Sequence, residues 1–212
     1  MKRTLYAAGT ALCLLLLLAV ILCAAVTHIG RDSGLYARCF HAFADTGRFG
    51  VTADAYAEIG RDLGDFFSGG DVDFSYFNQR EITHLSDIKQ LFSLLDRAWL
   101  LLIVLLPLAY ALARHPDGKG FVLGLGLTAL LLAALAACIA LDFEGAFILM
   151  HRLLFTNDLW LLNPNTDLLI CLMPEDMFMY LARRLAWIVI PAWLLAPALA
   201  ILTYQIRKTK RV

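Results

Sequence analysis

Four long apolar runs divide the chain and determine its fold class. A helix needs roughly 20 consecutive apolar residues to cross the hydrocarbon core of a bilayer. The second run is the shortest of the four, but apolar positions continue its helical face upstream, so we expect that helix to span about residues 93–113. The pattern predicts an all-α integral membrane protein with four transmembrane helices. The runs cover residues 5–26, 98–113, 121–141 and 185–204.

The charged residues predict how these helices are oriented. One side of the spans has eight Lys or Arg residues and a single acid, Asp117. Basic residues accumulate on the cytoplasmic side of membrane proteins, so we expect both termini in the cytoplasm and segments 27–92 and 142–184 on the outer face. The net charge of zero hides this asymmetry, which does not suit a nucleic-acid-binding role. The eight basic residues are Lys2, Arg3, Arg114, Lys119, Arg207, Lys208, Lys210 and Arg211.

The sequence indicates one integral membrane domain over residues 1–212, without internal repeats or a linker. The first run follows Lys2-Arg3 as a signal peptide would, but it exceeds the 7 to 15 apolar residues typical of one, so we expect a retained anchor. Cys39 and Cys171 both fall in the outer segments. This topology allows a disulfide between them, but a single pair of cysteines without a characteristic spacing is weak evidence for one.

The first outer segment contains two helix signals. Residues 53–67 have an apolar stripe at helical spacing, and Gly69-Gly70 ends the pattern, which predicts a helix that lies on the bilayer or caps the bundle. Further on, Asn78 can be the N-cap of the next helix, with Glu81 at the third helical position. The stripe consists of Tyr56, Ile59, Leu63 and Phe66.

The second outer segment begins with helical spacing and then changes character. Helical spacing over 143–155 gives way to a cluster of turn-forming residues at 163–167. Residues 168–173 are apolar again but too short to cross a membrane, so we expect them to dip into the interface or lie against it. Trp160 and Trp187 are expected at the depth of the lipid headgroups.

Each outer segment has one histidine among polar and aromatic residues. His84 lies three residues from both Glu81 and Asp87, and residues at that spacing are neighbours on a helix. A carboxylate beside an imidazole can orient the ring and raise its basicity, although Glu81 could simply complete a capping box and Asp87 could simply be solvated. His84 itself lies where a membrane helix meets water.

His151 is the second candidate, and it follows the third apolar run by about ten residues. Its neighbours include Arg152, Asn157 and Asp158. An interfacial histidine beside an arginine is often only a headgroup contact, but on the same side as His84 it is a plausible acid/base partner. The usual hydrolase and zinc-protease motifs are absent from the sequence. The nucleophile of a reaction at these residues would come from the substrate, from water or from a histidine side chain.

These residues resemble the lipoprotein intramolecular transacylases, a family of small four-helix bacterial membrane proteins. The resemblance covers nearly the whole chain and rests on two long motifs around the histidines. The first motif is Phe77-Asn78-x-x-Glu81-x-x-His84-Leu85-x-Asp87-x-Lys89-x-Leu91. The second is His151-x-x-x-Phe155-x-Asn157-Asp158-x-Trp160-x-Leu162-x-Pro164-x-x-Asp167-x-Leu169-Ile170-x-x-x-Pro174.

The resemblance implies an activity on diacylglyceryl-modified lipoproteins in the bacterial cytoplasmic membrane. The sn-2 acyl chain would move to the α-amine of the same N-terminal cysteine, without a cofactor or metal, and with membrane lipids around the outer-face site. It implies that His84 and His151 are the catalytic pair. The expected substrate-binding or supporting residues are Glu81, Asp87, Lys89, Arg152, Asn157, Asp158, Trp160 and Asp167.

Two other functions remain open at this point. Two histidines with one of the aspartates could form a two-histidine, one-carboxylate metal site, and the chain would then be a metal-dependent membrane hydrolase that chelators inhibit. Alternatively, the chain is a non-enzymatic four-helix scaffold whose outer segments bind a partner or headgroups. The aspartates considered for the metal site are Asp87, Asp158 and Asp167.

Overall fold

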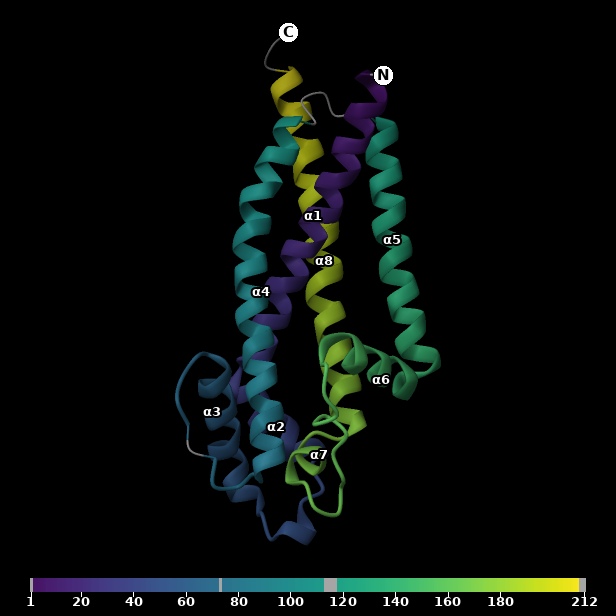
Figure 1. The fold of residues 1–212 in the computed structure, drawn as a ribbon. Coiled ribbons are helices and arrows are strands. Elements are labelled where there is room, and N and C mark those ends of the chain that lie inside the picture. The colour runs from purple at the N-terminus through teal and green to yellow at the C-terminus, as the bar shows by residue number, and fades with distance from the viewer. Residues whose placement is uncertain (1, 73, 113–117, 210–212) are drawn as a thin grey trace. The chain divides into compact units, whose positions relative to one another are not determined.

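The structure is a computed structural model that describes residues 2–72, 74–112 and 118–209. Arg114, Asp117, Lys210 and Arg211, which enter the topology expected above, lie outside the described residues. Every regular element in the described ranges is helical, and the order of the elements is visible in Figure 1. This confirms the all-α fold class.

Four helices are long and apolar enough to cross a membrane. They are α1 (Lys2–Gly30), α4 (Gln79–Leu112), α5 (Gly118–Leu141) and α8 (Glu175–Thr209). Their apolar stretches are Ala8–Gly30, Gln79–Ala111, Lys119–Leu141 and Glu175–Leu195. Each helix extends beyond the apolar run that predicted it, since polar turns continue the helix at one or both ends.

Shorter helices form the segments between these four. They are α2 (Ser33–Phe43), α3 (Tyr56–Phe67), α6 (Phe143–Leu154) and α7 (Leu168–Leu172), with 3₁₀ turns at Gly47–Phe49 and Ala53–Ala55. Two of them, α3 and α6, lie where helical spacing predicted helices, and α7 forms in the short apolar stretch 168–173. The sequence reading did not anticipate α2, although its buried residues have helical spacing; they are Leu35, Tyr36, Cys39 and Phe40.

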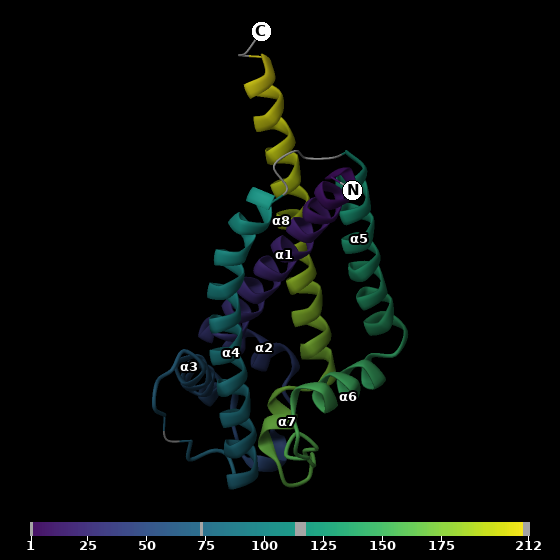
Figure 2. The ribbon, with the colours of Figure 1, turned by 45° about the horizontal axis from the view of Figure 1, so that its top comes forward.

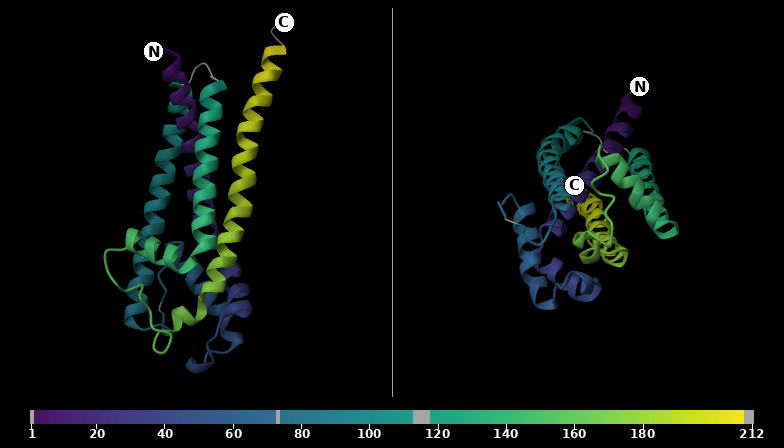
Figure 3. Two further views of the ribbon diagram at one scale, coloured as in Figure 1. Left: turned by 90° about the vertical axis from the view of Figure 1, so that its right-hand side faces the viewer. Right: turned by 60° about the horizontal axis from the view of Figure 1, so that its bottom comes forward.

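Contacts divide the chain into two compact units. The first unit consists of residues 1–25, 97–137 and 184–212, and the second of residues 26–96 and 138–183. In the first unit, the first turns of α1 and the last turns of α8 lie at the same end (Figures 1 and 3). Its buried cluster comes from α1 and α8, with α5 residues packed against it; the cluster consists of Leu18, Ala25, Val189 and Trp193.

In the second unit, α3 packs closely against α2 (Figure 2). The predicted stripe of α3 is buried, and two glycines one turn apart allow the backbones to approach. A Cβ atom on Gly60 would lie 2.9 Å from the Ala37 backbone nitrogen, and one on Gly64 would lie 2.7 Å from the Ser33 Cβ. Both are closer than real Cβ contacts, so this helix pair depends on glycine at both positions.

An ion pair joins the end of α1 to α4 within the second unit. The Arg31 guanidinium donates to both carboxylate oxygens of Asp96, at 2.7 and 3.1 Å, and its Nε donates to the Phe67 carbonyl at the end of α3. The guanidinium also lies 5.6 Å from the centre of the Phe92 ring. Three helices therefore meet at Arg31, a position that the sequence reading did not single out.

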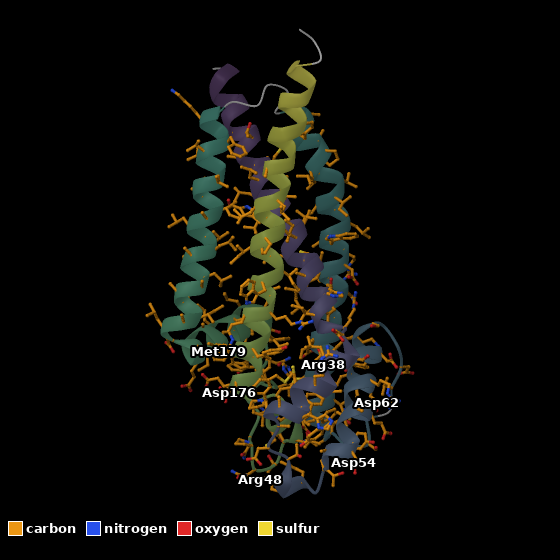
Figure 4. All side chains as sticks on the ribbon, turned by 180° about the vertical axis from the view of Figure 1, so that it is seen from behind. Arg38, Arg48, Asp54, Asp62, Asp176 and Met179 are labelled. Atoms are coloured by element: carbon orange, nitrogen blue, oxygen red, sulfur yellow. The ribbon has the colours of Figure 1, made fainter. Side chains whose placement is uncertain are left out.

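A long-range contact connects the loop after α2 with the turn-forming cluster. The exposed Arg48 side chain, labelled in Figure 4, donates to the Pro164 carbonyl and to the Asn165 side chain. The Cys171 thiol also donates to the Pro164 carbonyl. In the described structure no disulfide joins Cys39 to Cys171.

Candidate active site

The two candidate histidines lie side by side in the second unit. His84 is on the second turn of α4, and His151 is in the last turn of α6. Their ring centroids are 6.1 Å apart, and the Phe155 ring lies 5.1 Å from His84 and 5.6 Å from His151. Only 5% of His84 and 7% of His151 are exposed. The pair is therefore held in a largely apolar, water-poor environment.

The surroundings of His151 fix its ring and its tautomer. Its Nδ1 lies 2.8 Å from the Phe147 carbonyl oxygen, which can only accept, so Nδ1 is the protonated nitrogen and Nε2 of the neutral ring has a free lone pair. The Trp160 ring stacks on the imidazole at 5.0 Å. Burial lowers the pKa of His151, and the hydrogen bond to Phe147 only partly offsets this. His151 is a neutral base with one open nitrogen.

His84 has a different environment. Its Nδ1 is buried, and no hydrogen bond to it is found among the described residues. Neither Glu81 nor Asp87 is hydrogen-bonded to the ring; both carboxylates have other partners. A buried polar atom without a partner costs free energy, and a substrate atom that pairs with it would remove that cost.

The start of α4 is fixed by the capping box that the sequence predicted. The Asn78 side chain accepts from the backbone N–H groups of Arg80 and Glu81, and Glu81 accepts in return from the Asn78 N–H at 2.8 Å. Reciprocal bonds of this kind satisfy the open donors of a helix N-terminus. They hold the turn that precedes His84.

Glu81 also connects α4 to a segment far along the chain. Its second carboxylate oxygen accepts from the Leu169 N–H at 2.6 Å, across 88 residues, and only 1% of Glu81 is exposed. One carboxylate therefore accepts hydrogen bonds from backbone N–H groups at the N-termini of both α4 and α7. Its observed partners are backbone groups. Glu81 therefore belongs to the framework of the site, by which we mean the residues whose hydrogen bonds hold the segments around the two histidines in place.

Asp167, directly before α7, is the second carboxylate in this framework. It accepts from the Asn78 amide at 2.9 Å, from the Asn163 N–H at 2.7 Å and from the Thr166 hydroxyl. Desolvation raises the pKa of Asp167, but these hydrogen bonds outweigh it and keep the pKa below its ordinary value. The ionised side chain holds the 163–167 turn against the start of α4.

A third connection runs from α4 to the stacked tryptophan. Asp87 accepts from the Asn157 amide at 2.9 Å, and the Trp160 Nε1 donates to the Asn157 carbonyl at 2.9 Å. The sequence had suggested that Asp87 orients His84. In the structure its hydrogen bond goes to Asn157 instead, so Asp87 helps to hold the loop whose Trp160 ring stacks on His151.

Comparison with known proteins identifies the family. A sequence profile of the lipoprotein intramolecular transacylase Lit matches residues 10–178, a range that contains both histidines and the framework around them. The chain belongs to this family. It is an enzyme that moves an acyl group within a lipoprotein. In a separate comparison with curated proteins, none matched at a significant level.

Solved structures have the same fold as this transacylase. One is the membrane integral lipoprotein intramolecular transacylase Lit from Bacillus cereus, with 21% identity, a TM-score of 0.77, and coverage of 99% of this chain and 98% of that chain. Two histidine variants of that protein match with 21% and 20% identity and TM-scores of 0.72 and 0.73. They cover 100% and 99% of this chain and 94% and 96% of their own.

Three of the residues expected at the site of this transacylase make no described contact with either histidine. The Lys89 ammonium donates to the Gly70 carbonyl at 2.6 Å and lies 4.3 Å from the centre of the Phe66 ring, on the side of α4 that meets α3. Asp158 is exposed, and its backbone carbonyl accepts from the Arg80 guanidinium. Arg152 is exposed beside His151. Lys89 belongs to the framework, and Arg152 remains available to a substrate.

Arg80 is a framework residue that the sequence analysis did not single out. Its guanidinium donates to the backbone carbonyls of Asp158 and Leu161, which holds the loop on both sides of Trp160 near the start of α4. A basic side chain at a helix N-terminus is unfavourable for the helix dipole. That unfavourable placement is the signal in the sequence that could have suggested another role for it.

The geometry also bears on the metal-dependent alternative. Within the described ranges, no group of three or more His, Cys, Asp or Glu side chains is close enough to hold a metal ion. Asp87 and Asp167 are hydrogen-bonded to amide groups, and Asp158 makes no described contact with either histidine. The two-histidine, one-carboxylate set that the hydrolase would need is not assembled by these residues.

Proposed function

We propose that the protein transfers the sn-2 acyl chain of a diacylglyceryl-cysteine lipoprotein to the α-amine of the same cysteine, with His84 and His151 as the acid/base pair. The product is a lyso-form lipoprotein with an N-acyl chain and a free glycerol hydroxyl. The observation that supports this proposal best is the buried histidine pair, one member of which has its tautomer fixed by the Phe147 carbonyl. Family membership supports the substrate class.

The nucleophile comes from the substrate. A new N–C bond forms as the amine attacks the ester carbonyl, and the C–O bond to the glycerol then breaks. One proton leaves the attacking nitrogen and one is delivered to the glycerol oxygen, so the reaction needs no water. Because amine and ester belong to one molecule, the protein needs only to hold them in an attack geometry, where effective molarity is high.

His151 is the proposed proton carrier. An α-amine has an ordinary pKa of about 7.7 to 8.0 and is mostly protonated at neutral pH, so a base must remove its proton before or during attack. This first proton passes to the solvent, and the open Nε2 of His151 can take the second proton, which the nitrogen loses as the N–C bond forms, and deliver it to the leaving glycerol oxygen. The stacked Trp160 and the Phe147 carbonyl keep the ring oriented throughout.

His84 is the proposed stabiliser of the tetrahedral intermediate. The oxyanion that forms on the carbonyl oxygen needs a donor that is already in place. The buried ring of His84 faces an apolar environment beside His151, and its Nδ1 has no partner among the described residues. Arg152 is the nearby cation that can contribute to the same charge.

The site is proposed to open to the outer face of a bacterial cytoplasmic membrane, with both termini inside. The eight basic residues and one acid on the opposite side of the spans support this orientation. Single cysteines introduced at exposed positions, in a variant that lacks the natural cysteines, provide the test. Labelling of position 158 in intact cells by an impermeant maleimide supports the proposal, and labelling of position 119 instead would reverse the orientation.

The activity is tested with purified protein and a synthetic diacylglyceryl-cysteine lipopeptide. Mass spectrometry of the product should find an unchanged total mass, with one acyl group moved from an ester to an amide. Chelators should leave the rate unchanged if the reaction depends on the two histidines alone. Release of free fatty acid, or inhibition by chelators that zinc reverses, would favour the hydrolase instead.

We expect the pH dependence of the reaction to report the burial of His151. Its lowered pKa keeps the ring neutral at pH 7, so the base is lost only as pH falls below the ordinary histidine value of about 6.5. Because the substrate amine also titrates, at about 7.7 to 8.0, kcat/KM should fall with a slope of one below that pH and should steepen to a slope of two only below about 6.5, where His151 becomes protonated. A slope of two that is already reached at pH 7 would contradict a buried, neutral His151 as the base.

A further inference from the structure

The aromatic ring of Phe155 contacts both imidazoles of the candidate site. Its centroid lies 5.1 Å from that of His84 and 5.6 Å from that of His151, and the two histidine centroids are 6.1 Å apart. The three rings therefore form a triangle with nearly equal sides. Among the described ring contacts, those of Phe147 and Trp160 reach His151 but not His84. Phe155 is thus the apolar ring that the two histidines share.

The end of α6 explains the position of this ring. Phe155 directly follows the last residue of the helix, and its backbone is extended, with φ −121° and ψ 140°. Its N–H donates to the His151 carbonyl at 2.8 Å. Phe155 lies four residues after His151, a spacing that makes side chains neighbours on a helix. The ring therefore stays against the histidine while the backbone leaves the helix.

The exposure of these side chains places the Phe155 ring at the edge of the buried pair. Both histidines are buried and Phe155 is half-buried, whereas its neighbours in the chain, Leu154 and Thr156, are exposed. One part of the ring therefore contacts the imidazoles, and another part faces the surroundings of the protein. Removal of the ring would open this edge of the pair to small molecules such as water.

Water is a competing nucleophile in the proposed reaction. At neutral pH most of the α-amine is protonated and cannot attack, whereas the neutral ring of His151 can already act as a base. A water molecule at its Nε2 can attack the same ester. The water oxygen then bonds to the acyl carbon, the C–O bond to the glycerol breaks, and a water proton passes through His151 to the glycerol oxygen. The products are a free fatty acid and a lyso-lipopeptide without an N-acyl chain.

We infer that Phe155 determines the acceptor of the acyl group, because its ring keeps water from the histidine pair and leaves the substrate's own amine as the attacking group. This role rests on the proposed function. Exclusion of water from an active site prevents hydrolysis as a side reaction. The Phe155 ring has no ionisable group and takes no part in proton transfer, so its effect is on the choice between amine and water.

Two synthetic lipopeptides separate transfer from hydrolysis. Both contain a diacylglyceryl-cysteine, one with a free α-amine and one with an N-acetylated amine that cannot accept an acyl chain. Mass spectrometry measures the amide product of the first and the fatty acid released from either. The purified wild-type protein should release fatty acid from the second at least about 10²-fold more slowly than it converts the first, since the base then has no nucleophile to activate. Release at a comparable rate would mean that water reaches the pair despite Phe155, and would overturn the inference.

Removal of the ring should admit water. In Phe155→Ala, the release of fatty acid from the N-acetylated lipopeptide should rise at least about 10-fold, because general-base catalysis becomes available to water. The Phe155→Ala/His151→Ala double variant should lose this release, since the same base activates the water. Phe155→Leu retains an apolar side chain and should stay closer to the wild type. A low rate of release in Phe155→Ala, with or without transfer, would mean that the ring only holds the site together, and would overturn the inference.

Phe143→Ala is the matched control. Phe143 is on the same helix and is also half-buried, but its described ring contact is with Phe147, at 5.9 Å, and not with either histidine. This variant should release fatty acid within a factor of about two of the wild-type rate. An equal rise in Phe143→Ala would mean that any loosening of α6 admits water, which also overturns the inference. Failure of the wild-type protein to convert the free-amine lipopeptide would instead contradict the proposed function itself.

Discussion

Replacement of His151 by alanine is expected to lower the rate of N-acylation of a diacylated lipopeptide by about 10²- to 10⁴-fold, the range typical of a general acid/base. His84→Ala should have a similar effect, because the oxyanion and the proton transfer belong to one step. If the two rings act as a unit, the double variant should be little worse than either single variant. The rate is measured as conversion of ester to amide by mass spectrometry.

The control for these variants is His28→Ala. His28 is exposed and makes no described contact with the site, so its replacement should leave the rate within a factor of about two. Far-UV circular dichroism and the thermal midpoint in detergent show whether each variant is folded. A folded His84→Ala or His151→Ala variant with full activity would remove the central element of the proposed mechanism.

The second large effect is expected at Glu81. Its two carboxylate oxygens accept from the partly buried N–H of Asn78 and from the buried N–H of Leu169, and Glu81→Ala removes this acceptor from both. The unpaired buried N–H of Leu169 costs about 1–3 kcal/mol, and the lost hydrogen bond to Asn78 costs about 0.5–1.5 kcal/mol, so the unfolding free energy should fall by about 2–4 kcal/mol. Glu81→Gln, which retains one acceptor oxygen, should cost less.

The matched control for Glu81 is Asp54→Ala. Asp54 is an exposed acid in the 3₁₀ turn before α3, and its replacement should change stability by no more than about 0.5 kcal/mol. Stability is followed as the denaturant midpoint in detergent micelles. If Glu81→Ala is as stable as the wild type but loses activity, Glu81 acts on the substrate, and its assignment to the framework is wrong.

The local patterns in the sequence predicted most of the fold. Runs of about 20 apolar residues gave the four long helices, the stripe of Tyr56, Ile59, Leu63 and Phe66 gave α3, and the Asn78–Glu81 spacing gave the capping box. Each of these patterns involves residues within one helix turn or on one helix face. The regular geometry of a helix is therefore enough to predict the structure from the spacing of the residues.

The partners of the charged residues were not predictable in the same way. Asp87 and Lys89 are close to His84 in sequence, but the structure pairs them with Asn157 and Gly70, 70 and 19 residues away. Arg31 and Asp96 are 65 residues apart. A single sequence does not show which distant segment will contact a given side chain. Spacing along the helix therefore suggested that Glu81 and Asp87 are partners of His84, whereas in the structure both are hydrogen-bonded to other segments.

The hydrogen bond between Glu81 and Leu169 has a consequence for the biogenesis of the protein. The chain is synthesised from its N-terminus, and 88 residues separate this donor from its acceptor. While α5 is being inserted, His84 has been made but His151, Trp160 and the α7 segment have not. At that stage a nascent chain therefore contains only one histidine of the proposed catalytic pair and only the α4 side of the residues that surround it. If the two histidines act together as proposed, the protein becomes active only after residues 142–184 have been synthesised and have packed against the start of α4.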